Sequence, residues 1–334
     1  MIDCAPTFSV RDSLRGRRRA IELSDASEQA ATQNWLPLEI NQISAGNYQG
    51  HMRVVEHADV SVYFENQNCT VHKRGVMDDK FCTVSFFRSQ LPQTRFSEFS
   101  PTDNSLFFLP CGTEFDIYVP GNTKTVYFRI DQSKLLDKAR TMNPGRWENL
   151  PAGLQILDLL DRRFLDIFTD DIYASVAPTG GAGAQGLHGP LEDMMMDQVL
   201  LAMSSSSSGS ADAFPELSIR RRAREVVNQV VEYVGEKFTQ NICPTISDIC
   251  QDLKVSERTL QYGFKKILNL SPNTYLRYRR LNQVRMQLLR PANADVTVTD
   301  IAMHWHFWHL GRFSSDYLKL FSELPSTTLR RVPD

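Results

Sequence analysis

The feature that most constrains this chain is a six-residue pattern that occurs twice in its last third. The segment TISDIC at 245–250 returns 52 residues later as TVTDIA at 297–302. In each copy a Thr stands three residues before an Asp, as at many helix N-termini. The Thr hydroxyl can accept a free backbone N–H, and the Asp lies in the positive first turn. The repeat predicts two copies of one helical unit.

Each copy continues as a short helix, a tight turn and a longer amphipathic helix. The turns are Lys254-Val255-Ser256 and His306-Phe307-Trp308. The apolar stripe of the first long helix is Leu260, Phe264 and Leu268, and at an offset of 53 residues it returns as Phe313, Tyr317 and Phe321. Pro272 and Pro325 follow at the same offset. The pattern predicts a tandem helix-turn-helix, at about 245–268 and 297–321.

The faces opposite these stripes have the side chains that a helix in a DNA major groove needs, which are polar and cationic. For a single residue, a solvated helix face remains the competing interpretation. The expected DNA contacts are Ser256, Glu257, Arg258, Thr259, Gln261, Tyr262 and Lys265 in the first unit, and His309, Leu310, Arg312, Ser315, Asp316 and Lys319 in the second. Phosphate contacts are expected from the helix between the units, at Arg277, Arg279 and Arg280, with Arg285 a further candidate.

The charge of the chain is divided in the same way. Residues 216–334 hold 18 Lys and Arg against 12 Asp and Glu, and the preceding residues hold 19 against 27. A basic C-terminal part beside an acidic N-terminal part fits a nucleic-acid-binding domain with a separate partner domain. We therefore expect an N-terminal domain at 1–177, a helix with flexible linkers at 178–217, rich in Gly, Ala and Ser, and a DNA-binding domain at 218–331.

The N-terminal part indicates an α+β fold that begins with strands. Apolar residues alternate in three runs, at 60–64, 115–119 and 126–130, which predicts a small β-barrel or jelly roll at about 38–130. Pro120-Gly121-Asn122 predicts a hairpin between the last two runs. Two helices are expected after Asp131. One carries Leu157, Leu160, Phe164, Ile167 and Phe168, and the other carries Leu191, Met194, Met195, Val199 and Met203. They either pack on their own barrel or form an oligomer surface.

Several kinds of chemistry find no support in the sequence. The six cysteines form no C-x-x-C pair, and the seven histidines give one H-x-H, His304 and His306, without an evident third ligand. There is no nucleophile elbow, P-loop or dinucleotide fingerprint. We expect no metal, no catalytic residue and no enzyme activity. No apolar stretch is long enough to span a membrane, and no apolar core follows the arginines near the N-terminus, so we expect a cytoplasmic protein.

The C-terminal residues resemble the AraC/XylS family of bacterial regulators. The likeness lies in SERTLQYGFKKIL at 256–268, in LSPNTYLRYRRLNQVRMQLL at 270–289 and in VTDIAMHWHFWHLGRFSSDYLKLFSELPSTTLRR at 298–331. Within the family, DICQDLKVSERTLQ at 248–261, FWHLGRFSSDYLKLFSELPS at 307–326 and, more faintly, PCGTEFDIYVP at 110–120 are most similar to regulators of ethanolamine operons. The resemblance implies a cupin-like sensor domain, activation of a catabolic operon, and ethanolamine or cobalamin as effector.

The sequence departs from the family pattern at the ends of helices. His306 stands where family members usually have Gly in the second turn, and Asn269 and Ser322 stand where Gly usually follows the recognition helices. Asn tolerates a left-handed backbone better than His or Ser. We therefore expect the second unit to read DNA less strictly than the first.

Taken together, these residues predict an effector-responsive activator that binds double-stranded DNA and contacts RNA polymerase. A small molecule in the N-terminal barrel would favour the arrangement, or the homodimer, in which both recognition helices fit adjacent major-groove segments. In the alternative hypothesis the N-terminal domain only dimerises and binds no small molecule. A third hypothesis, an enzyme fused to a DNA-binding domain, has no metal triad to support it.

Overall fold

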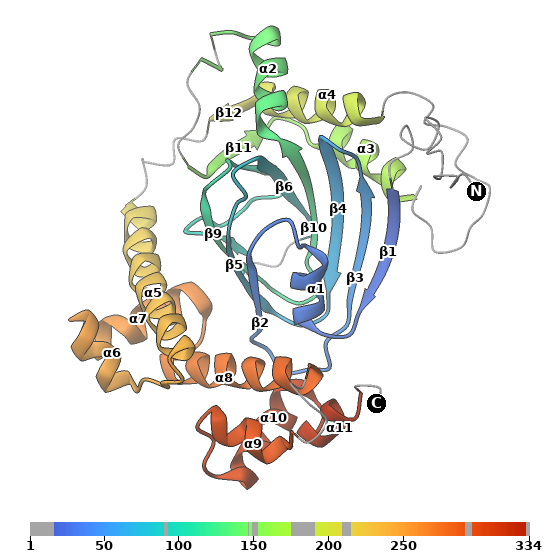
Figure 1. Ribbon diagram of the computed structural model, residues 1–334. Coiled ribbons are helices and arrows are strands. Elements are labelled where there is room, and N and C mark those ends of the chain that lie inside the picture. The colour runs from blue at the N-terminus through green and yellow to red at the C-terminus, as the bar shows by residue number, and fades with distance from the viewer. Residues whose placement is uncertain are drawn as a thin grey trace, which may run out of the picture.

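The computed structural model describes residues 17–89, 93–145, 147–148, 153–174, 191–208, 215–290 and 296–331. Strands dominate the described residues up to Asp131, and helices dominate those after 215 (Figure 1). The Gly/Ala-rich segment at 178–190, predicted to be a linker, lies outside the described residues.

The strands form two antiparallel sheets that face each other (Figure 1). The larger sheet has the order β1 (Arg17–Leu23), β3 (Gly50–Glu56), β4 (Val60–Gln67), β10 (Lys124–Asp131), β6 (Phe81–Ser89), β8 (Ser105–Leu109), β11 (Gln155–Leu159) and β12 (Ser206–Ser208). The smaller sheet has the order β2 (Leu38–Gln42), β5 (Val71–Val76), β9 (Glu114–Val119) and β7 (Arg95–Phe96). The described strands thus make two separate sheets and no closed barrel, so the cupin-like barrel stays a prediction.

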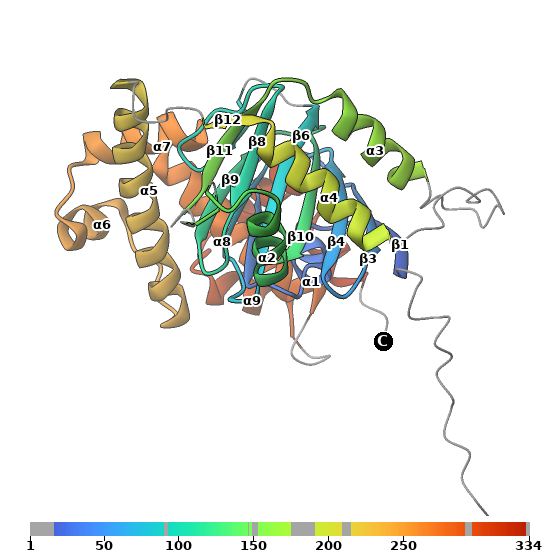
Figure 2. The ribbon, with the colours of Figure 1, turned by 90° about the horizontal axis from the view of Figure 1, so that it is seen from above.

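The larger sheet is buried on both of its faces. Val62, Phe64 and Phe128 belong to an outer core with the helices α2 (Gln132–Met142), α3 (Arg163–Ala174) and α4 (Leu191–Ser204). Figure 2 shows these helices along the sheet, with α5, α6 and α7 at another side of the molecule. Tyr63 and Tyr127 lie on the opposite face, toward the smaller sheet, in a second core with α1 (Ala26–Thr32). The predicted alternation at 60–64 therefore marks the outer face.

The predicted hairpin around Pro120-Gly121-Asn122 is wrong. Strand β9 pairs with β5 and β7, whereas β10 pairs with β4 and β6, so the turn carries the chain from one sheet to the other. Gly121 is required here because a Cβ would lie 2.1 Å from the carbonyl oxygen of Asn68. Alternation identified both strands, but the partner of each strand depends on residues far away in the sequence.

Two predictions after Asp131 also need correction. Leu157 lies in strand β11, and Leu160 and Ile167 are exposed, so the five residues chosen for one helical face do not share one. The Ser-rich segment from Ser204, predicted to be a flexible linker, contains strand β12, since Ser206–Ser208 pairs with β11. The second predicted helix is confirmed as α4, whose Met195, Val199 and Met203 pack on the larger sheet.

The C-terminal part contains only helices among its described residues. These are α5 (Pro215–Thr239), α6 (Ile246–Leu253), α7 (Glu257–Leu268), α8 (Pro272–Leu289), α9 (Val298–His304), α10 (Leu310–Phe321) and α11 (Pro325–Leu329). Helix α8 belongs to two cores. Its Tyr275 and Leu276 pack with α5, α6 and α7, while its Leu281, Val284 and Leu288 pack with α9 and α10. The two predicted units are therefore joined by one shared helix.

Candidate nucleic-acid interface and sensor cavity

Both repeats of the T-x-x-D pattern form capping boxes, as predicted. In the first, the Asp248 backbone N–H donates to Thr245 Oγ1 at 3.2 Å, and the Thr245 N–H donates to Asp248 Oδ2 at 2.8 Å. Thr297 and Asp300 repeat both bonds at 3.1 Å. Each box satisfies N–H groups that a helix N-terminus otherwise leaves without a partner. The two units therefore begin with the same local geometry.

The turns have the backbone conformation that glycine adopts most easily. Lys254 has a φ of 54° and His306, 52 positions later, has a φ of 59°. Asn269 and Ser322, which follow the two long helices, have φ values of 52° and 56°. The ring of His306 is held by the Asn241 carbonyl, which accepts a hydrogen bond from Nε2 at 3.1 Å. The departures from the family pattern thus leave the left-handed turns in place at a cost in backbone strain.

Helix α7 presents the predicted reading face to solvent. Leu260, Phe264 and Leu268 are buried, as expected of the stripe. The seven residues predicted to contact DNA in this unit are all exposed: Ser256, Glu257, Arg258, Thr259, Gln261, Tyr262 and Lys265. Ser256 also caps the helix, because its Oγ accepts from the Thr259 N–H at 3.1 Å. The Ser256 and Thr259 hydroxyls also lie 2.8 Å apart, so the side chains that remain available to DNA are Glu257, Arg258, Gln261, Tyr262 and Lys265.

Helix α10 has a similar face with one difference. His309, Leu310, Arg312, Ser315 and Lys319 are exposed, as the prediction requires. The Asp316 carboxylate instead lies 3.6 Å from an Arg277 nitrogen, so it is turned toward α8. The pairing also engages Arg277, one of the predicted phosphate contacts.

Sequence reasoning missed Trp308, which is 62% exposed just before α10. Its ring centroid lies 5.5 Å from that of His306. A search for polar and cationic side chains could not select it, and its exposure in the turn is the signal that the structure adds.

The prediction of a phosphate contact is wrong for Arg279. Its side chain is only 4% exposed, donates to the Val231 carbonyl at 2.9 Å, and pairs with Glu39 of β2 at 2.5 Å. Arg285 is equally buried, between Asp25 and Glu323. Arg280 is half-buried, with its guanidinium 4.8 Å from the centroid of the Phe307 ring. These three arginines of α8 therefore stabilise contacts within the protein.

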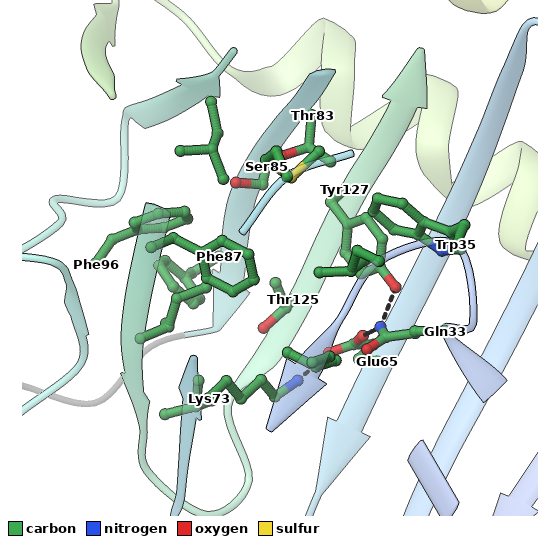
Figure 3. A pocket seen from close by; sticks show the side chains of 17 residues that line it. Gln33, Trp35, Glu65, Lys73, Thr83, Ser85, Phe87, Phe96, Thr125 and Tyr127 are labelled. Atoms are coloured by element: carbon green, nitrogen blue, oxygen red, sulfur yellow. Dashed lines mark hydrogen bonds and ion pairs between the residues drawn. The ribbon is translucent and has the colours of Figure 1, made fainter. Parts of the chain in front are cut away.

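A cavity of about 70 Å³ lies between the two sheets (Figure 3). Its walls are mainly apolar, and they include Trp35, Phe87, Phe96, Phe115 and Ile117. A polar cluster lines the same cavity, formed by Gln33 after α1, Glu65 of β4, Lys73 of β5 and Tyr127 of β10. Burial, followed by the charge of Glu65, raises the pKa of Tyr127 well above its usual range, so its hydroxyl keeps its proton.

Strand β5 connects this cavity with the helical part. Lys73 points inward and pairs with Glu65 at 2.5 Å. Its neighbours point the other way, as strand geometry requires. His72 Nδ1 lies 2.9 Å from the Tyr275 hydroxyl of α8, and Arg74 pairs with Glu232 of α5 at 3.3 Å. A movement of β5 at the cavity would therefore change its contacts with α5 and α8.

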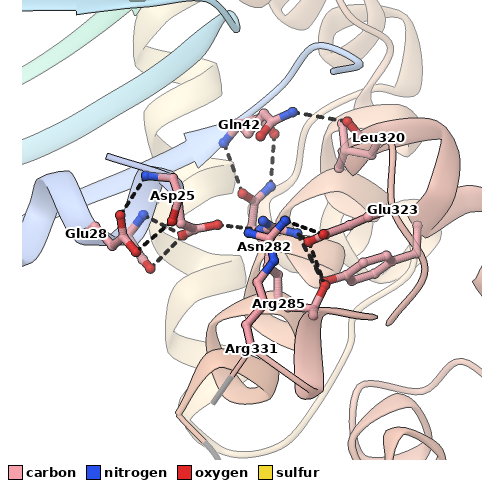
Figure 4. A network of polar contacts seen from close by, with 12 residues as sticks. Asp25, Glu28, Gln42, Asn282, Arg285, Leu320, Glu323 and Arg331 are labelled. Atoms are coloured by element: carbon pink, nitrogen blue, oxygen red, sulfur yellow. Dashed lines mark hydrogen bonds and ion pairs between the residues drawn. The ribbon is translucent and has the colours of Figure 1, made fainter. Parts of the chain in front are cut away.

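Strand β2 and the residues next to it make a second set of contacts with the helices (Figure 4). The backbone of Gln42 exchanges hydrogen bonds with the Asn282 side chain at 3.0 and 2.9 Å. The Leu320 carbonyl, in the last turn of α10, accepts from Gln42 Nε2 at 3.0 Å and from the Gly46 N–H at 2.9 Å. Such carbonyls have no partner within their own helix. The β-rich part thus binds α8 and the second unit together.

Arg224 of α5, the helix that packs on the first unit, contacts the smaller sheet in a similar way. It pairs with Asp116 of β9 at 2.8 Å and with Glu98 at 3.3 Å. Burial alone would raise the pKa of the Asp116 carboxyl, but the contacts with His72 and Arg224 lower it well below its usual range. Asp116 is therefore ionised at neutral pH.

The described residues contain neither a candidate metal site nor a candidate membrane-spanning helix. No group of three or more His, Cys, Asp and Glu side chains there could hold a metal ion. None of the described helices combines the length and the apolar character needed to cross a membrane.

Comparison with known proteins finds similarity in the C-terminal part. Residues 249–331 match a family model described as a helix-turn-helix domain. The chain is 36% identical over 108 residues to a probable thc operon regulatory protein of Rhodococcus erythropolis, a match covering 32% of each protein. It is 38% identical over 104 residues to XylDLEGF operon transcriptional activator 1 of Pseudomonas putida, covering 31% of this chain and 30% of the relative. The chain therefore spans about a third of the length of these curated relatives.

Two solved structures are also similar. A probable AraC family transcriptional regulator from Rhodopseudomonas palustris is 31% identical over 33% of this chain and 99% of that one, with a TM-score of 0.30. The AraC-like transcriptional activator CuxR is 14% identical over 81% of this chain and 96% of that one, with a TM-score of 0.38. Over residues 249–331 the chain therefore has a helix-turn-helix domain similar to those of DNA-binding transcription regulators of the AraC/XylS type.

Proposed function

We propose that the protein activates a catabolic operon from the cytoplasm, by placing α7 and α10 in adjacent major-groove segments and contacting RNA polymerase. The observation that carries this proposal is the pair of helices with buried stripes and exposed faces, joined through α8. Helix α8 has 18 residues, so it is about 27 Å long at 1.5 Å per residue. That length is comparable with one DNA helical turn, roughly 34 Å, which is the spacing two consecutive recognition helices need.

Footprinting upstream of the neighbouring operon, followed by mobility shifts on the protected fragment, tests this proposal. Arg258→Ala and Arg312→Ala each remove one exposed cation from a recognition face and should weaken binding. Arg163→Ala is the matched control, because Arg163 is also exposed but lies on α3 of the β-rich part. Unchanged binding by both recognition-helix variants would refute the assignment of α7 and α10.

We further propose that residues up to 177 form a cupin-like sensor and residues 218–331 the DNA-binding domain. The contacts of β5 and β2 support this division of roles, because they link the cavity wall to α5, α8 and α10. An occupant that shifts these strands would change the populations of arrangements of the two units. Operator affinity should then differ between the empty and the occupied protein.

The cavity chemistry bears on the effectors that the family resemblance implies. Ethanolamine is a cation at neutral pH, and the cavity already holds Lys73, whose charge is balanced by Glu65. Cobalamin is a macrocycle far larger than about 70 Å³. Neither effector gains support from this cavity.

Exposed apolar side chains also support the proposal that the protein forms a homodimer. Leu160 and Ile167 are among the most exposed large hydrophobic residues described, and both lie at or near α3. Exposed apolar patches are common at protein interfaces. Sedimentation of the wild type and of Ile167→Glu tests this, since the variant should shift toward monomer. A monomeric wild type would refute the dimer.

A further inference from the structure

The charges within the cavity are balanced, and this restricts what can bind there. Lys73 and Glu65 are 6% and 5% exposed, and they form an ion pair at the cavity wall. We propose, resting on the sensor role above, that the cavity binds a small uncharged molecule. This molecule would have an apolar body about the size of one ring, and one group that both donates and accepts hydrogen bonds, such as an amide or a phenol.

The size and walls of the cavity support the apolar body. A volume of about 70 Å³ is several times the 10–15 Å³ that a single water needs. It is about half of the roughly 150 Å³ of a cavity known to hold benzene, so a one-ring ligand fits once the side chains around it shift slightly. The aromatic and aliphatic side chains around it, among them Phe87, Phe96 and Phe115, offer no charge to a ligand. Binding would bury apolar surface on both sides, which is the main driving force in such sites.

The ion pair supports the absence of net charge. A carboxylate would compete with Glu65 for Lys73, and an ammonium would compete with Lys73 for Glu65. In either case one buried charge would lose its partner, which is strongly unfavourable. An uncharged donor–acceptor group can add hydrogen bonds while the pair stays intact. It can accept from Lys73, whose ammonium has three donors, or donate to Glu65.

Ser85 provides the second polar contact. It lies on β6 opposite Tyr127, is 6% exposed and lines the cavity. Its hydroxyl has no hydrogen-bond partner among the residues that the structure describes. Buried hydroxyls are almost always hydrogen-bonded, so an unpartnered one facing a cavity can take its partner from a ligand. In Figure 3, Ser85 and the Glu65–Lys73 pair lie in different parts of the cavity.

Three probes with the same ring and different charge test the proposal on the full chain. They are benzamide (uncharged), benzoate (anion) and benzylamine (cation), titrated by calorimetry at pH 7.5. Benzamide should bind at least tenfold more tightly than either ion. Equal or tighter binding of an ion, or no binding of benzamide, would overturn the proposal.

Variants of the ion pair should reverse this preference. Glu65→Gln leaves Lys73 without a counter-charge, so benzoate should become the preferred probe. Lys73→Met leaves Glu65 alone, so benzylamine should become preferred. If either single variant unfolds, the double variant Glu65→Gln/Lys73→Met removes both charges together and should prefer benzamide still. Preferences that stay unchanged in a folded single variant would contradict the charge argument.

Ser85→Ala should weaken benzamide binding by about three- to tenfold, the usual worth of one hydrogen bond. A change of less than twofold would show that Ser85 does not contact the ligand. Mobility shifts without any probe separate this proposal from the DNA-binding one. A chain that shifts DNA but binds no benzamide refutes only the ligand class. A chain that binds benzamide with unchanged operator affinity supports the site and refutes the sensor role.

Discussion

Asp25 at the N-cap of α1 and Arg285 in the C-terminal half of α8 form a buried ion pair, although 260 residues separate them in the sequence. The same Asp25 accepts from the Ser27 N–H, so it begins α1 while holding α8. Arg285 also pairs with Glu323 at 2.5 Å, just beyond α10. Three segments thus meet at one guanidinium (Figure 4).

Arg285→Met should therefore destabilise the protein. Removing one partner of a buried pair costs about 3–5 kcal/mol, because carboxylates stay buried without a counter-charge. Urea unfolding of the wild type and the variant measures the difference. Arg258→Ala is the control, since an exposed residue usually changes stability by no more than about 0.5 kcal/mol. A stability loss for Arg285→Met as small as that of the control would contradict this role.

Arg258→Ala should relax the specificity of the first unit at one base pair. A bidentate contact between Arg and guanine is worth about 1–3 kcal/mol of discrimination. Lys265→Ala, as the loss of a phosphate contact, should weaken all sequences alike and lower the salt slope by about one ion. Mobility shifts on operators with single substitutions, at several salt concentrations, separate the two effects. A Lys265 variant with altered base preference would show that Lys265 reads a base and does not hold a phosphate.

Thr245→Ala should destabilise the first unit by about 1 kcal/mol, because it removes the hydroxyl that accepts from the Asp248 N–H. Thr297→Ala should have a similar effect in the second unit. Thr245→Ser and Thr297→Ser keep the hydroxyl and serve as matched controls. Thermal unfolding measures all four variants. Ala and Ser variants of equal stability would show that the caps contribute nothing.

The repeated units could be predicted from the sequence because their signals are local. A capping Thr, an Asp three residues later and an apolar stripe lie within a few turns of helix, and the second copy confirms the first. Arg279 shows where this reasoning ends. Its spacing on α8 suits a phosphate contact, but its partner is Glu39, 240 residues away in another part of the fold. Residue type alone does not distinguish these two environments.

The cavity could not be predicted, for a related reason. Alternation in β4 draws attention to Val62 and Phe64, which face the outer helices. The cavity is lined instead by Glu65, one residue further along, and by Lys73 from the opposite sheet. A charged pair formed across two sheets has no signature in either strand. The predicted hairpin at 120–122 failed in the same way, because strand pairing is decided by distant segments.

His306→Gly should keep or increase the stability of the second unit. His306 has a φ of 59°, which costs a residue with a Cβ about 1 kcal/mol or more and a glycine almost nothing. The substitution also loses the hydrogen bond from Nε2 to the Asn241 carbonyl, so the net gain is small. His306→Ala loses the same bond and keeps the strain, so it should be about 1 kcal/mol less stable than His306→Gly. Thermal unfolding that ranks Ala above Gly would refute the strain.

Acidification should weaken the contact between β5 and α8 through His72. Burial lowers the pKa of His72 below 6.5, although the Asp116 carboxylate, 3.9 Å from Nε2, acts in the opposite direction. The unfolded chain takes up a proton near pH 6.5, and the folded chain does so only at lower pH. The contribution of His72 to stability is therefore complete above pH 6.5 and is lost as the pH falls below it, by at most about 1.4 kcal/mol per pH unit.

Urea unfolding at pH 7.5 and 5.5 measures this loss, and His72→Gln should reduce it. The groups that face the ring are Asp116, Tyr275 and Arg74, and all three stay in place in the variant. Burial also lowers the pKa of His57, so part of the pH dependence should remain in His72→Gln. His51→Gln is the control, because His51 is exposed on β3. A His72→Gln variant with the full wild-type pH dependence would show that this buried ring is not the acid-sensitive group.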